Sequence, residues 1–188
     1  MKKVLWTVTF VLILALAASA QDAEKKVNLY LGAGASLPMG DLGDRWNFGL
    51  HGAGAVGFVV APGFQILGKV EYHTFGIDDQ GLSGVDGGSF NAFMFGGAGR
   101  YNFPMENSKF SPFITGGIGM ANAKISDLTI GTLTIEGDSD TKVYFEVGAG
   151  FDIGAGETMS IFFQGRYVSI QLEGSAASFI PFTVGLKF

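Results

Sequence analysis

Hydrophobic and polar residues alternate along most of the chain. In the segment 27–37, apolar residues occupy every second position from Val27 to Leu37, and Asn28, Tyr30 and Ser36 fall between them. A period of two residues is typical of a β-strand with one apolar and one polar face. The same pattern predicts eight strands, at about residues 27–37, 48–60, 64–76, 90–103, 110–121, 142–154, 159–170 and 179–188.

The connections between the predicted strands alternate in length. Three are short, near 61–63, 104–109 and 155–158. The other four are longer and polar, at 38–47, 77–89, 122–141 and 171–178. Transmembrane β-barrels show this asymmetry, with long extracellular loops and short periplasmic turns. An even number of strands then places both chain ends on the periplasmic side, and each strand is long enough for a tilted crossing, which takes about 9–11 residues.

Aromatic residues gather near the ends of the predicted strands. Such residues form girdles at the two membrane interfaces of a transmembrane barrel. The predicted girdles contain Phe64, Tyr101, Phe103, Phe110 and Phe188 at the short-turn end, and Trp46, Phe48, Phe90 and Phe179 at the long-loop end. The alternative is a secreted sandwich or a lipocalin-like barrel, in which the apolar faces would point inward.

If the apolar faces meet lipid, charged residues occupy the interior. An eight-stranded barrel is only wide enough for side chains to fill it, so these charges are expected to neutralise one another and to plug the barrel. The predicted interior network contains His51, Lys69, Glu71, His73, Arg100, Glu146, Asp152, Arg166 and Lys187.

Hairpin geometry predicts two contacts within this network. Folding strands 2 and 3 about Pro62 places His51 opposite His73, and folding strands 6 and 7 about Gly156 places Glu146 opposite Arg166. A shift of two residues in either register would move the partners while keeping the inward phase. The two histidines, with Glu71 nearby, could bind a metal, but hydrogen-bonded interior histidines are the simpler interpretation, and no metal or cofactor is expected.

The start of the chain has the order of a secretory signal peptide. A basic Met1-Lys2-Lys3 precedes an apolar stretch over 4–17, and Ala18-Ser19-Ala20 forms a small-residue cleavage site. Residues 1–20 are therefore predicted to be a signal peptide, with cleavage between Ala20 and Gln21, and 21–188 one barrel domain. The alternative, an uncleaved anchor helix, needs about 20 apolar residues, and this stretch is shorter.

Composition narrows the function. The formal net charge is −5, which argues against nucleic-acid binding. The chain contains no cysteine, which excludes a disulfide, a thiolate metal site and a lipoprotein anchor. Mean hydropathy is +0.33 although no stretch after residue 20 reads as a spanning helix. Thirty glycines and 18 phenylalanines suit barrel walls better than helices.

Two apparent motifs carry little weight. Residues 52–57 match the G-x-G-x-x-G pattern, but no helix follows them, and similar Gly/Ala runs recur on four other predicted strands. Acidic residues at 78, 79, 86, 136, 138 and 140 could hold a divalent cation, although ordinary solvated loops are the simpler explanation. Catalysis on lipid A by a Ser and a His is a further alternative, but the chain has two histidines, both phased inward.

The chain resembles the eight-stranded outer-membrane β-barrels that include the transmembrane domain of outer-membrane protein A and the small surface barrel called protein X. The resemblance rests on the terminal strand 182–188, on residues 111–120 with their Pro-aromatic-x-x-Gly-x-Gly pattern, and on the inward Arg100 and Arg166. In the terminal strand, the residues that match the family's assembly signal are Phe182, Val184, Leu186 and Phe188.

The resemblance implies an antiparallel up-and-down transmembrane β-barrel in a bacterial outer membrane. It implies contact with outer-membrane lipid, lipopolysaccharide and the barrel assembly machinery, as a monomer. No peptidoglycan-binding domain follows the barrel, so a cell-wall anchoring role is not expected. The predicted function is non-enzymatic: envelope structure, or contact with a surface ligand through four long extracellular loops. The alternatives are a narrow pore, a carrier for a small hydrophobic ligand and, more distantly, a lipid A-modifying enzyme.

Overall fold

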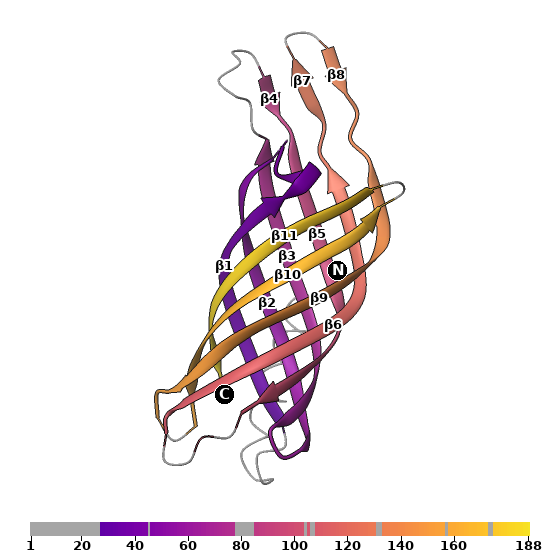
Figure 1. Ribbon diagram of the computed structural model, residues 1–188. Coiled ribbons are helices and arrows are strands. Elements are labelled where there is room, and N and C mark those ends of the chain that lie inside the picture. Colours follow the sequence, from indigo (N-terminus) through magenta and orange to yellow (C-terminus); the bar gives the residue numbers. More distant parts are fainter. Residues whose placement is uncertain are drawn as a thin grey trace, which may run out of the picture.

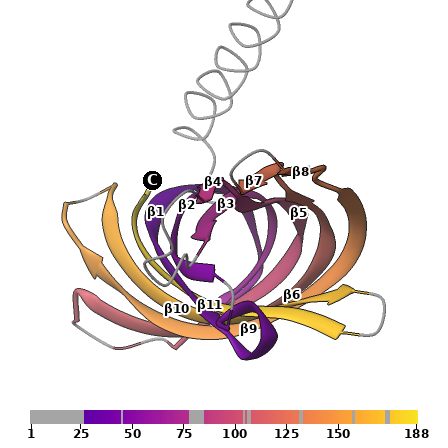
Figure 2. The same cartoon turned by 90° about the horizontal axis from the view of Figure 1, so that it is seen from above.

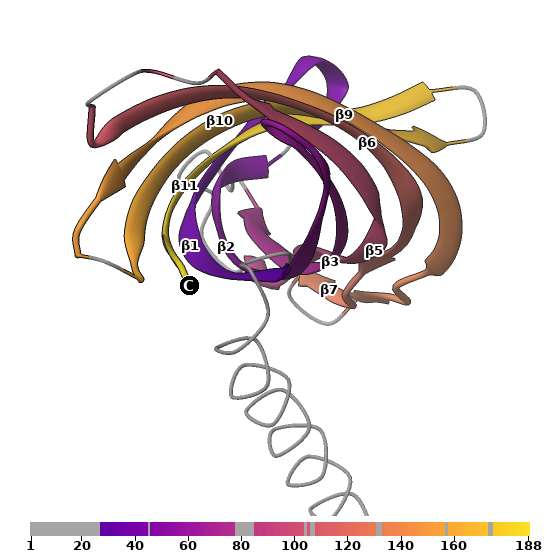
Figure 3. The ribbon, with the colours of Figure 1, turned by 90° about the horizontal axis from the view of Figure 1, so that it is seen from below.

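The chain forms a closed antiparallel β-barrel. The computed structural model describes residues 27–44, 46–77, 85–103, 105, 108–130, 133–156, 158–172 and 175–188. The eight barrel strands are β1 Val27–Met39, β2 Trp46–Ala61, β3 Phe64–Ile77, β5 Ser89–Asn102, β6 Phe110–Ile125, β9 Ser139–Gly154, β10 Ser160–Leu172 and β11 Ser175–Lys187. Each pairs with its neighbours in the order β1-β11-β10-β9-β6-β5-β3-β2, and the views along the barrel show the resulting ring (Figures 2 and 3).

The last residue of the chain helps to close the ring. Strand β11 pairs with β1, and beyond its end the backbone N–H of Phe188 donates to the carbonyl of Leu29 at 2.9 Å, while Leu29 donates back at 3.1 Å. Closure matters because a barrel has no strand edge, so the wall strands satisfy their backbone groups without water. The fold therefore needs the terminal strand to be paired along its whole length.

All eight predicted strands are present, but several continue further at the long-loop end. Strand β6 runs to Ile125, and β9 begins at Ser139. Beyond them, residues expected to be loops form three short strands, β4 Val85–Gly87, β7 Leu128–Ile130 and β8 Leu133–Ile135. These pair in the order β4-β7-β8 and rise above the barrel at the end opposite the C-terminus (Figure 1). The extension continues the wall, since Ser126 donates to the carbonyl of Ser89 at 2.9 Å.

Two of the four connections predicted to be long are short. Strand β10 ends at Leu172 and pairs there with Ser175, the first residue of β11, so two residues join them. Strand β1 ends at Met39 and β2 begins at Trp46, so six residues join them, and these include the 3-10 turn η1, Gly40–Leu42. The prediction failed at 171–178 because outward positions there are polar: Ser169 Oγ accepts hydrogen bonds from Gln171 and Ser178. Alternation between an apolar and a polar face is lost, although the strands continue.

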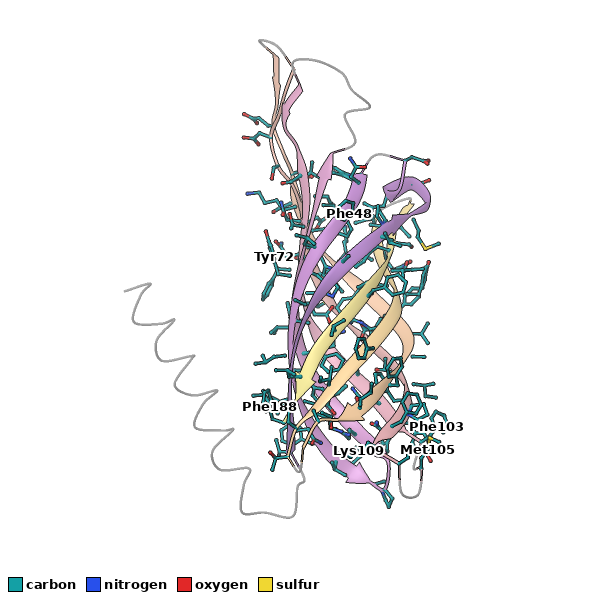
Figure 4. All side chains as sticks on the ribbon, turned by 90° about the vertical axis from the view of Figure 1, so that its left-hand side faces the viewer. Phe48, Tyr72, Phe103, Met105, Lys109 and Phe188 are labelled. Carbon is teal, nitrogen blue, oxygen red and sulfur yellow. The ribbon has the colours of Figure 1, made fainter. Side chains whose placement is uncertain are left out.

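The outer surface of the barrel is apolar. Phe48, Leu50, Ile118 and Val147 are among the most exposed large hydrophobic side chains, at 58–66%. In Figure 4 the labelled Phe48 and Tyr72 lie toward the upper end of the wall, and Phe103, Met105 and Phe188 lie toward the lower end. Among the described residues, no helix is long and apolar enough to cross a membrane.

The predicted girdle at the long-loop end is wrong for three of its four residues. Phe90 is 3% exposed and Phe179 is fully buried, because both share the inward phase of their strands. Trp46 packs against a cluster of buried residues that includes Phe90 and Phe179. The strand register is irregular between Trp46 and Gly49, which changes the direction in which the Trp46 side chain points. Phe48 alone points outward. The five aromatic residues predicted for the short-turn end are all exposed, at 37–47%.

Candidate functional site

The middle of the barrel interior holds a four-residue ion cluster. Lys69 and Glu71 come from β3, Glu146 from β9 and Arg166 from β10, and the side chains of all four are at most 6% exposed. Arg166 Nη1 lies 2.7 Å from a carboxylate oxygen of both Glu71 and Glu146. Lys69 Nζ lies 3.1 Å from Glu71 and also pairs with Glu146. Two cations and two anions make the cluster neutral, which buried charges require.

A second ion cluster closes the end near the short turns. Arg100 pairs with Asp152, and the Arg100 Nε donates to Asn102 at 3.0 Å. The Arg100 guanidinium also lies 3.5 Å from the centre of the Phe113 ring, a cation–π contact. Lys187 reaches Asp152 at 3.3 Å from a side chain that is 20% exposed. The Arg100 side chain is thus held by an ion pair, a hydrogen bond and a ring contact.

A small cavity separates the two ion clusters. Its volume is about 50 Å³, and its walls include Tyr30, Lys69, Arg100, Gln164 and Arg166. About 10–15 Å³ suffices for one water molecule, so the cavity can hold a few. The Nε of Arg166 is buried without a hydrogen-bond partner among the described residues. The cavity is small, and charged side chains of both ion clusters are among its lining residues, so it suits water better than an apolar ligand.

Above the middle ion cluster, one serine joins two histidines. Ser36 Oγ from β1 lies 3.0 Å from Nδ1 of His51 and 3.0 Å from Nδ1 of His73. The two imidazole rings are stacked, with centroids 4.9 Å apart. His51 Nε2 lies 2.9 Å from Thr183 Oγ1, and His73 Nε2 lies 3.2 Å from Glu71. We call Ser36, His51, His73 and Thr183 the histidine bridge.

The interior beyond the histidine bridge is apolar. The ring of Phe75 contacts those of Phe179 and Phe90, with ring centroids 5.3 Å and 5.8 Å away. Leu42 from η1 packs against the same cluster. We call this cluster the apolar plug; it consists of Leu42, Phe75, Phe90, Ala92, Met94, Ala121, Ala123, Tyr144, Val168, Ile170, Ala177 and Phe179.

Comparison with known proteins agrees with this geometry. Residues 8–188 match the profile of the family described as "Outer membrane protein beta-barrel domain". The chain belongs to this family. It is therefore an outer-membrane β-barrel protein, and its exposed apolar face is the face that meets lipid. The secreted alternative with inward apolar faces is excluded. No match to a curated protein sequence was found.

Solved structures show the same fold at low sequence identity. Neisserial surface protein A is 14% identical with a TM-score of 0.64, over 86% of this chain and 96% of that one. Ail, the attachment invasion locus protein of Yersinia pestis, in complex with the heparin analogue sucrose octasulfate, is 12% identical with a TM-score of 0.54, over 87% and 99%. The N-terminal β-barrel domain of Pseudomonas aeruginosa OprF is 13% identical with a TM-score of 0.52, over 87% and 98%.

The structure of this barrel places the predicted interior residues together in the lumen. Eight of the nine are buried, and Lys187 lies near the short-turn opening with part of its side chain exposed. The predicted pairing of His51 with His73 is confirmed by the strand register. The predicted register of Glu146 is wrong by two residues, since Glu146 faces Val168 and Arg166 faces Gly148.

Glu146 and Arg166 nevertheless form an ion pair. The reason is the residue opposite Arg166: a Cβ built on Gly148 would lie 2.5 Å from the Cγ of Arg166. The arginine side chain therefore crosses the space that a larger residue would fill, and reaches both glutamates. Sequence spacing could not reveal this contact, because it depends on side-chain reach across the lumen rather than on register.

Several interior residues were missed by the sequence reasoning. Ser36 and Thr183, which complete the histidine bridge, are uncharged, as are Asn28 and Gln65, which hydrogen bond at 3.0 Å near the short-turn end. The available signal was phase, because each lies on the same face as a charged residue. The apolar plug was also missed, because a phenylalanine near the end of a strand was expected to belong to an interfacial girdle even where its phase pointed inward.

The other predicted sites have mixed outcomes. Phe182, Val184, Leu186 and Phe188 lie on the outer face at the end of the chain, 38–53% exposed. Ala18, Ala20 and Gln21 lie outside the described residues. Within the part of the chain that the structure describes, no group of three or more His, Asp or Glu is placed to hold a metal. A chain of hydrogen bonds runs from Ser36 through His73 to Glu71, as in hydrolase triads, but the side chains of Ser36 and His73 are fully buried.

Proposed function

We propose that this protein is a closed, non-enzymatic outer-membrane barrel that acts at the cell surface through the extension formed by β4, β7 and β8. The proposal rests on one observation: side chains fill the lumen, whereas the longest connections between strands extend beyond one end of the barrel. The two ion clusters, the histidine bridge and the apolar plug fill the lumen from end to end, whereas the two long connections rise beyond the rim as paired strands (Figure 1). This arrangement supports a role for the surface of the extension rather than transport through the lumen.

The filled lumen argues against both transport alternatives. A hydrophobic ligand would need an apolar chamber, but the cavity between the ion clusters measures about 50 Å³ and is lined by Lys69, Arg100 and Arg166. An ion would need a continuous polar path, but the apolar plug covers the long-loop end. These features support a structural or surface-contact role.

Burial also argues against an enzyme. A nucleophilic serine must reach its substrate, and the hydroxyl of Ser36 lies inside the barrel with both histidines bonded to it. Lipid meets the opposite side of the wall. Mass spectra of lipid A are therefore expected to be the same in a deletion strain and in an overexpressing strain, and any altered acyl chain would contradict a non-enzymatic role.

The surface of the long-loop end indicates the kind of partner. Exposed acidic residues gather there: Asp41, Asp44, Asp127, Glu136, Asp138 and Asp140. A polyanion such as the heparin analogue bound by Ail would meet like charges, so we propose that a partner of this end is neutral or basic.

The targeting features belong to the same proposal. We propose that residues 1–20 are removed after Ala20 and that the terminal strand is read by the barrel assembly machinery, with lipopolysaccharide surrounding the long-loop end. The intact mass of protein purified from outer membranes is expected to correspond to 21–188, and a mass that includes residues 1–20 would contradict cleavage.

The experiment that tests the closed lumen is single-channel recording of refolded 21–188 in a planar bilayer at pH 7.5. Different migration of boiled and unboiled samples in gels shows that the barrel has folded. We expect no conductance steps, because ion pairs and the apolar plug block the lumen. Steady conductance in folded protein would show that the lumen is open and would favour the narrow-pore alternative.

A further inference from the structure

The lipid-facing side of the wall carries one charged side chain. On the outward positions of the eight barrel strands, as far as the structure describes them, Lys124 is the one charged residue. Its phase follows from its neighbours on β6, because Ala121 and Ala123 are buried whereas Asn122 and Lys124 are exposed. The other charged residues of these strands follow the inward phase. A charge on the lipid face is costly at the bilayer midplane and is tolerated near the interfaces, so the height of Lys124 matters.

Lys124 lies above the apolar band of the wall, toward the long-loop end. It comes 14 residues after Phe110 on β6, which is about 46 Å along the strand and about 35 Å in height at a tilt of about 40°. The apolar band of a transmembrane barrel is about 25 Å tall, with aromatic girdles at both interfaces. Because Phe110 belongs to the exposed aromatic residues of the short-turn end, Lys124 reaches the level of the headgroups on the opposite side of the membrane.

The residues around Lys124 on the outer face are polar and uncharged. Across the strands, Lys124 lies opposite Asn91 on β5 and Ser139 on β9. Asn91 accepts a hydrogen bond from the hydroxyl of Tyr72 at 3.0 Å and donates one to Ser89 at 2.8 Å. We call this group the polar patch; it consists of Tyr72, Ser89, Asn91, Asn122, Lys124, Ser126, Ser139 and Thr141.

The polar patch has hydrogen-bond donors to spare. The hydroxyl oxygens of Ser89 and Ser126 lie 2.8 Å apart, so one hydroxyl hydrogen serves this contact. The hydrogen of the other hydroxyl then needs an acceptor, and none lies among the described residues. Lys124 lies two residues before Ser126 on the same face and adds an ammonium group with three donors. Within the described part of the chain, Lys124 forms no ion pair.

The carboxylates next to the polar patch in sequence are already engaged. Asp140 pairs with Lys142 at 2.8 Å. Asp127 and Asp138 each accept a hydrogen bond from a backbone N–H at 2.8 Å. The ammonium group of Lys124 therefore remains available to an anion from outside the chain.

We propose that the polar patch binds a phosphate group of lipopolysaccharide, with the Lys124 ammonium and a hydroxyl of the Ser89–Ser126 pair as donors. The family places the barrel in the outer membrane, whose outer leaflet presents phosphorylated sugars at headgroup height. A phosphate supplies both the negative charge and the acceptor oxygens that these donors require. The inference rests on the proposed orientation, in which the extension of β4, β7 and β8 is extracellular (Figure 1).

The test is the binding of lipid A to folded 21–188 in maltoside detergent micelles, measured by native mass spectrometry. Lipid A with two phosphate groups is compared with lipid A from which both phosphates have been removed. Lys124→Gln is expected to weaken binding of the phosphorylated form about fivefold, the contribution of one cation near an anionic lipid surface, and to leave binding of the other form unchanged. Lys124→Arg keeps the charge and is expected to bind as the wild type does.

Lys109→Gln is the matched control, because Lys109 is an exposed lysine at the short-turn end (Figure 4). It is expected to bind lipid A as the wild type does, and heat-dependent migration shows that each variant has folded. Equal binding by the wild type and Lys124→Gln, or an equal loss in Lys109→Gln, would overturn the phosphate site. Binding in micelles does not depend on orientation, so that result would leave the surface role of the extension standing. An inverted orientation on intact cells would overturn both, because lipopolysaccharide lies in the outer leaflet.

Discussion

At the scale of single residues, the glycine opposite Arg166 determines how the interior charges meet. Gly148 leaves open the space that the Arg166 side chain crosses on its way to Glu71 and Glu146. Removing either charge partner would leave an uncompensated buried ion, which typically costs 3–5 kcal/mol. A residue without a side chain is thus part of what allows the ion cluster to form.

Gly148→Ala is expected to destabilise the barrel by about 1–3 kcal/mol, because its Cβ would lie 2.5 Å from both Arg166 Cγ and the carbonyl of Gly165. Urea unfolding of the refolded protein in lipid vesicles measures the change. Gly68→Ala is the matched control, since nothing lies within 4 Å of a Cβ at that position. Equal stability of the two variants would show that Arg166 does not depend on Gly148.

At the scale of elements, each barrel strand presents different environments along one inward face. Along the inward face of β3, Gln65 lies near the short-turn end, and Lys69 and Glu71 belong to the middle ion cluster. His73 follows in the histidine bridge, and Phe75 lies in the apolar plug. Strand β11 likewise carries Phe179 inward in the plug and Phe182 outward toward lipid. An inward phenylalanine therefore contributes packing that an outward one does not.

Phe179→Ala is expected to cost about 3–5 kcal/mol of unfolding free energy, because it leaves a cavity among Phe75, His73 and the rest of the plug. Phe182→Ala lies three residues further along the same strand, where the side chain is 53% exposed, and is expected to cost less. Chemical unfolding in the same vesicles compares them. A larger loss for Phe182→Ala would mean that the plug does not stabilise the barrel.

At the scale of the whole molecule, the two ends of the barrel differ. One end carries short turns and the C-terminus, and the other carries the extension of β4, β7 and β8 (Figure 1). In the membrane this asymmetry sets which end faces the outside, and the proposed surface role requires that the extension be extracellular.

Orientation can be measured directly because the chain contains no cysteine. Asp138→Cys places a thiol in the connection between β8 and β9, and Lys109→Cys places one at the short-turn end (Figure 4). A membrane-impermeant maleimide added to intact cells is expected to label Asp138→Cys and to spare Lys109→Cys. Both are expected to react after lysis, and the reverse pattern on intact cells would invert the orientation.

The sequence by itself determined the strands and the direction in which their residues point. Alternation with a period of two identified all eight barrel strands, and phase alone placed His51, Glu71 and Arg166 inside. Phase is a local property of the backbone, so it can be read without knowing the partners of a strand. The pairing of His51 with His73 followed because a tight turn sets a local register.

Only the tertiary structure decided which interior side chains meet. Arg166 reaches Glu146 in spite of the register, and Ser36 joins two histidines from other strands, because side chains of an eight-stranded barrel converge across a narrow lumen. It also decided that Phe90 and Phe179 form a plug and that residues 85–87, 128–130 and 133–135 continue the wall. These outcomes depend on contacts between segments far apart in the chain, where a two-residue pattern carries no information.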